Sequence, residues 1–188
     1  MNHRRTSLRR LNRYLRTSDR ILASWDAYTE FRTDLDGWPF DPDAYGRRAA
    51  VRDGDTATAF ASTRAGARQL LATARLQLQH LPAHLTRTNW PGQLTILEDA
   101  LRRLDALDKE WCQTLAQLPE GTGPGSEAYD DALDEHHAEC WSYLDDWAYH
   151  GRAILDIQAA TRRTGPQPKR PQLPALTSRP GGYRATRR

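Results

Sequence analysis

The sequence has no long run of apolar residues. Nothing in its 188 residues approaches the roughly 18 consecutive apolar residues that a membrane-spanning helix needs, so we expect a soluble protein. Cysteine is scarce: Cys112 and Cys140 are the only two, and no apolar secretory segment accompanies them. The pair Arg4-Arg5 is followed by further arginines rather than by the apolar stretch of an export signal. These features predict free thiols and a cytoplasmic location, and the scarcity of lysine beside abundant arginine is typical of a GC-rich bacterial coding sequence.

Recognisable catalytic motifs are also missing. The segment GTGPGS (121–126) lacks the lysine of a phosphate-binding loop and has a proline where backbone amides would be needed. The sequence contains no G-x-S-x-G, H-E-x-x-H or C-x-x-C motif. We therefore predict a protein that is not an enzyme and binds no cofactor.

Charge, in contrast, is distributed very unevenly. Residues 126–150 hold eight acidic side chains and no Lys or Arg, whereas residues 1–20 carry seven Arg and a single acid. One interpretation is internal pairing between the first and last helices, and two others are a docking surface for a basic partner and a solvated face. Internal pairing would bring arginines of the first helix (Arg9, Arg13, Arg16, Arg20) opposite acids of the last (Asp130, Asp134, Asp145, Asp146), each exposed pair contributing about 0–1 kcal/mol.

Apolar residues recur at three- and four-residue steps, which predicts helices. The clearest row lies in the third quarter of the chain, and the first and last rows are longer. Helix ends are indicated by Gly37 and Pro39, by Pro82 and by Pro119. The expected helices span residues 7–35, 55–81, 90–118 and 126–163.

Between the first two helices, residues 38–54 contain Pro39, Pro42, Gly46 and Gly54 and are expected to form a loop with at most one helical turn. Its aromatic residues are expected to cover one end of the bundle, as is Trp90 at another junction. Tryptophans on the predicted apolar faces are expected in the core. The loop aromatics are Trp38, Phe40 and Tyr45, and the core tryptophans are Trp25, Trp111 and Trp147.

One cluster contains the residue types that ligate metals. Asp134 and His137 are three apart, and His136 and Cys140 are four apart, so each pair shares a helix face; Glu135 and Glu139 lie beside them. A di-iron carboxylate bundle would need a second acid-x-x-His pair, and the sequence has none. We therefore favour a packed histidine beside a solvated one, and keep a carboxylate/histidine metal enzyme as a remote alternative.

The C-terminal segment from residue 164 contains five prolines, six cations and no acid, so we expect a disordered basic tail. Its cations are able to displace counterions from a phosphate backbone whatever the base sequence, and Tyr183 could stack on an exposed base. A Pro-rich ligand for a protein groove is the other interpretation. The candidate nucleic-acid-binding residues are Lys169, Arg170, Arg179, Tyr183, Arg184, Arg187 and Arg188.

Together these patterns predict an all-α fold: an elongated, coiled-coil-like, four-helix antiparallel bundle over residues 7–163, with a disordered segment 1–6 and a disordered Pro-rich tail 164–188. The expected function is a helical interaction or scaffold protein that binds a protein partner or itself. The alternative is an accessory nucleic-acid-binding protein that uses its basic N- and C-terminal arms.

Overall fold

The computed structural model of the protein describes residues 2–164 and is all-α, as predicted. No strand occurs in these residues; an isolated bridge between Thr33 and Pro39 is the only β-type pairing there. The helices are α1 (Asn2–Arg32), α2 (Pro42–His80), α3 (Trp90–Gln117), α4 (Glu127–His150) and α5 (Arg152–Thr164), with a short 3-10 helix η1 (Ala83–Leu85) before α3.

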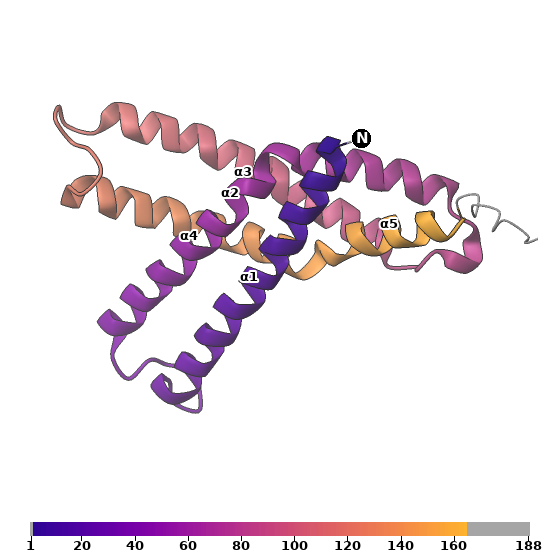
Figure 1. Ribbon diagram of the computed structural model, residues 1–188. Helices are drawn as coiled ribbons and strands as arrows, with labels where there is room; N and C mark the ends of the chain where they lie inside the picture. Colours follow the sequence, from indigo (N-terminus) through magenta and orange to yellow (C-terminus); the bar gives the residue numbers. More distant parts are fainter. Residues whose placement is uncertain (1, 165–188) are drawn as a thin grey trace, which may run out of the picture.

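The helices form antiparallel hairpins that cross one another (Figure 1). α1 and the first half of α2 make one arm, and the second half of α3 and the first half of α4 make another. The second half of α2 runs beside the start of α3 and beside α5 (Figure 1). The molecule is therefore a bundle with two projecting arms. The single helix predicted over residues 126–163 is divided at Gly151 into α4 and α5.

The core lies where the arms join. Trp147, Ile154 and Ile157 of the last two helices are fully buried there, against Leu11 and Tyr14 of α1. The predicted leucine row of the third helix is confirmed over its first half, because Leu94, Leu97, Leu101, Leu104 and Leu107 are all buried. Toward the arm the row is only half-covered, since Trp111 is half-buried and Leu115 is exposed.

The prediction for the start of α2 was wrong. Residues 38–54 were expected to form a loop, but α2 begins at Pro42, where the proline occupies the first turn and the Asp41 side chain accepts a hydrogen bond from the backbone N of Ala44 at 3.0 Å. Each internal glycine costs a helix about 1 kcal/mol relative to alanine. Packing against α1, including the edge-on contact between Tyr45 and Trp25, offsets that cost.

Both ends of α1 also differ from prediction. The helix begins at Asn2, so residues 2–6 are helical rather than disordered, and Arg4 is tied to Gln158 of α5 by a hydrogen bond. It ends at Arg32 rather than at residue 35, because the Asp34 carboxylate accepts hydrogen bonds from the backbone N of Asp36 and Trp38 and closes a turn.

The aromatic residues of this turn do not cover the bundle. Trp38 and Phe40 are exposed, which contradicts the prediction that they would close one end, whereas Tyr45 is half-buried. Trp147 is a core residue, as predicted, and Trp90 is buried in the core as well rather than covering an end of the bundle. Trp25 and Trp111 were also expected in the core but are only half-buried. The exposed turn lies at the far end of the α1–α2 arm (Figure 1).

Candidate functional site

The candidate metal cluster lies on α4 where it faces α2 and α3. His136 stacks on Trp111 of α3 with ring centroids 5.2 Å apart, and its Nε2 is 3.8 Å from the Cys140 Sγ. His137 turns instead toward α2, close to Gly54. His136, His137 and Cys140 line a pocket of about 210 Å³ together with Phe60 and Leu144.

The environment of this cluster suits packing better than chemistry. Burial, followed by the nearby Asp108 and Glu139 carboxylates, raises the pKa of the Cys140 thiol to about 11, so the thiolate is scarce at neutral pH. Burial also lowers the pKa of His136 and of His137, which favours neutral imidazoles. Within residues 2–164, no three His, Cys, Asp or Glu side chains come together in a way that could hold a metal ion. The geometry gives the metal-enzyme alternative no support.

Sequence reasoning missed a buried ion pair at the root of the α1–α2 arm. The Arg52 Nη2 lies 2.7 Å from the Asp53 Oδ1, and both side chains are well covered. The Arg52 guanidinium sits between two indoles, 4.3 Å from the Trp25 ring centroid and 3.8 Å from that of Trp141. α1, α2 and α4 thus meet around one cation, and we assign this group a structural role in orienting the arm.

Interhelical charge pairing joins α2 to α3, and not α1 to α4 as one interpretation of the sequence had it. Arg64 reaches Asp105 at 2.7 Å and Asp108 at 2.6 Å, and Arg68 also pairs with Asp105. Farther along, Arg75 pairs with Glu98. Among the described residues, no ion pair links an arginine of α1 to an acid of α4.

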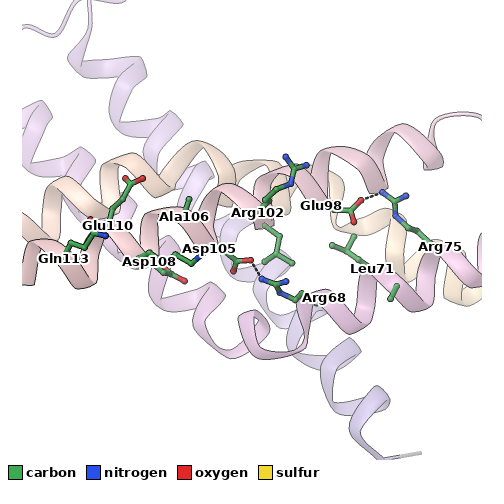
Figure 2. A pocket seen from close by; sticks show the side chains of 13 residues that line it. Arg68, Leu71, Arg75, Glu98, Arg102, Asp105, Ala106, Asp108, Glu110 and Gln113 are labelled. Atoms are coloured by element: carbon green, nitrogen blue, oxygen red, sulfur yellow. Dashed lines mark hydrogen bonds and ion pairs between the residues drawn. The ribbon is translucent and has the colours of Figure 1, made fainter.

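The pairs made by Arg68 and Arg75 span a surface groove of about 1110 Å³ between α2 and α3. Figure 2 shows Arg68 directed at Asp105 and Arg75 directed at Glu98 across it. Arg102, on the same groove, pairs with Asp99 within its own helix. Because its arginines already have carboxylate partners, the groove is a charged seam between two helices and offers these cations to no ligand.

Two exposed surfaces of the described residues stand out beside the acidic face of α4, whose carboxylates form no ion pair there. The first is the end of the α1–α2 arm, which we call the arm tip (residues 31–43) and which contains large apolar residues open to solvent. The second is the solvent face of α1, with its row of arginines. The candidate tail residues Lys169, Arg170, Arg179, Tyr183, Arg184, Arg187 and Arg188 lie outside the described residues.

Comparison with known proteins identifies no relative. No protein-family model, no curated protein and no solved structure matches the chain. No helix within residues 2–164 combines the length and the apolar character needed to cross a membrane. Evidence for a function therefore comes from the arm tip and from the row of arginines on α1.

Proposed function

We propose that the protein is a non-enzymatic helical interaction protein that binds a protein partner through the arm tip. The observation behind this proposal is the exposure of four large apolar side chains at the tip: Phe31, Leu35, Trp38 and Phe40 are each at least 70% exposed. Covering one such side chain contributes about 1.5–3 kcal/mol, and clusters of this kind mark interaction sites. Tryptophan is also among the residues that dominate binding energy at protein interfaces.

The tip holds these side chains on an ordered turn. The backbone N of Asp34 donates to the carbonyl of Trp38 at 2.9 Å, and the backbone N of Phe40 donates to the carbonyl of Arg32 at 3.0 Å. Gly37 takes the left-handed conformation, with a φ of 85°, that closes the turn. A preorganised turn loses little conformational entropy on binding, so its apolar area contributes more fully to affinity.

Charge at the tip indicates what the partner looks like. Asp34, Asp36, Asp41 and Asp43 alternate along the sequence with the apolar residues of the turn, whereas Arg32, Arg47 and Arg48 line a hollow beside Phe40. An anionic lipid surface would repel these carboxylates. The complementary partner is therefore a protein with an apolar pocket and a basic rim.

Site-specific photocrosslinking in the native host tests the proposal. A photoreactive amino acid at position 38 should form a defined adduct, and the same amino acid at position 103, exposed on α3, should not. Light scattering on the purified protein then shows whether the adduct partner is a second copy. A protein that is monomeric and gives no adduct specific to position 38 would contradict the proposal.

A further inference from the structure

The exposed arginines of α1 follow a helical period. Arg5, Arg9, Arg13, Arg16 and Arg20 are spaced by four, four, three and four residues, so they lie along one face of the helix. We call this row the arginine stripe; all five side chains are exposed. The opposite face of the same helix is buried through Leu11, Tyr14, Leu15 and Ser18.

No described carboxylate neutralises the stripe. None of its arginines forms an ion pair within residues 2–164, whereas three arginines of α2 each pair with acids of α3. Arg16 and Arg20 donate through Nε to carbonyls of their own helix, at 3.3 and 3.4 Å, and Arg20 also donates through Nη2 to the Thr17 hydroxyl at 3.3 Å; these partners are neutral and leave both charges in place. Like charges three and four residues apart destabilise a helix, so the arrangement works against folding. A ligand that neutralises the row would remove that repulsion.

A groove extends the stripe at its N-terminal end. Arg5 and Arg9 of α1 face Arg162 of α5 across a space of about 490 Å³. Polar and aliphatic side chains complete the lining: Asn12, Gln158, Leu8, Leu155 and Ala159. No acidic residue lines this groove. Cations from two helices far apart in the sequence thus meet at one surface, which the sequence pattern could not show.

We propose that the arginine stripe and the α1–α5 groove bind the phosphodiester backbone of nucleic acid. The guanidinium group matches phosphate with paired N–H donors, and arginine is preferred over lysine for this contact. At 1.5 Å per residue, the stripe from Arg5 to Arg20 extends roughly 22 Å, which covers about six base-pair steps of duplex at 3.4 Å each. Such contacts read the backbone and not the bases.

An anionic membrane fits the stripe less well. Helices that lie on membranes insert an apolar face into the lipid, but the apolar face of α1 is already packed inside the protein. The stripe itself has no aromatic or aliphatic residue that could anchor in lipid or stack on a base. These facts favour backbone recognition, independent of base sequence.

Fluorescence anisotropy on the full chain tests the proposal, using labelled DNA and RNA duplexes of roughly 20 base pairs, about three times the expected footprint. A single-stranded oligonucleotide of the same length shows which source of phosphodiester is preferred. To isolate the stripe, measurements are repeated in a chain whose six tail cations (Lys169, Arg170, Arg179, Arg184, Arg187, Arg188) are replaced by Gln. If each of the five arginines of the stripe contacts one phosphate, the affinity for duplex should fall roughly 500-fold between 50 and 200 mM salt.

The variant R9Q/R13Q/R16Q should lose three of those contacts, so the same change in salt should reduce its residual affinity only roughly 12-fold. The control R47Q/R103Q/K109Q removes the same charge from exposed positions on α2 and α3 and should bind like the parent. R9K/R13K/R16K should keep the salt dependence, which guards against a folding defect in the glutamine variant.

Four results would overturn the proposal. They are absence of binding at 50 mM salt in the tail-neutralised chain, equal losses in the stripe and control variants, loss of the salt dependence in the lysine variant, and binding to anionic vesicles or an acidic peptide without binding to any oligonucleotide. Failure here leaves the arm tip untouched, because crosslinking from position 38 does not involve the stripe.

Discussion

Replacing Arg52 by Met tests the buried group at the root of the α1–α2 arm. Methionine keeps the length and helix propensity of the side chain but removes its charge. The Asp53 side chain, only 4% exposed, then loses its partner at 2.7 Å. An abandoned buried charge costs about 3–5 kcal/mol, and each lost contact with an indole adds about 0.5–1 kcal/mol.

The expected loss for R52M is therefore about 4–7 kcal/mol, a large share of the 5–15 kcal/mol that stabilises a typical domain. Unfolding by urea, followed by circular dichroism, measures it. In R52M/D53N the penalty of the unpaired carboxylate is absent, so the double variant should be more stable than R52M alone.

The loss should also depend on pH. Burial raises the pKa of Asp53, while the hydrogen bond from Arg52 lowers it, so removing Arg52 raises this pKa further. A carboxyl group with a raised folded-state pKa lowers the free energy of unfolding by its full amount at pH values above that pKa. The penalty disappears as the pH falls to the unfolded value of 3.8. R52M should thus lose less stability at pH 4 than at pH 8. A cost of R52M below about 1 kcal/mol, or an equal cost when D53N is already present, would refute the reasoning.

Four other variants have defined outcomes. G151A should lose about 1–3 kcal/mol in urea unfolding, because its Cβ would lie 2.5 Å from the Trp147 carbonyl oxygen and 3.1 Å from Leu15; G46A, with open space around it, should gain about 0.5–1 kcal/mol. H136Q/H137Q should flatten the fall in stability as the pH drops below 6.5. Histidines whose folded-state pKa is lowered contribute stability above the unfolded value of 6.5 and lose that contribution as the pH falls; an unchanged slope would contradict this. W38S should leave the melting temperature nearly unchanged and should weaken crosslinking to the partner from a photoreactive residue at position 35. A large loss of stability would show that Trp38 is structural.

The helical rows could be predicted because they are local. Leu94, Leu97, Leu101 and Leu104 repeat at the pitch of a helix, and any helix with that face must bury it. The same reasoning failed at residues 42–54, where proline and glycine indicated a loop. The cap at Asp41 and the packing against α1 overrode that local preference.

The arginine stripe was within reach of sequence reasoning. Its spacing of four, four, three and four is as regular as that of the leucines, but the sequence left two interpretations open: internal pairing with the acids of the last helix, and a basic N-terminal arm that binds nucleic acid. The arginines have no carboxylate partner among the described residues because the acids of α4 do not lie opposite them. The spacing of residues within α1 does not reveal the position of α4. The arm tip had no comparable signal, because Leu35 continues the apolar row that predicts burial and only the turn at Asp34 takes it out of the core.

The sequence by itself determined that the chain forms amphipathic helices and that the leucines of α3 from Leu94 to Leu107 lie inside, because helix periodicity and burial of apolar surface act over neighbouring residues. Only the tertiary structure decided which charges pair, that Arg52 lies between two indoles, and that the tip aromatics and the arginine stripe remain uncovered. These outcomes depend on how whole helices cross, and contacts between distant segments set that geometry.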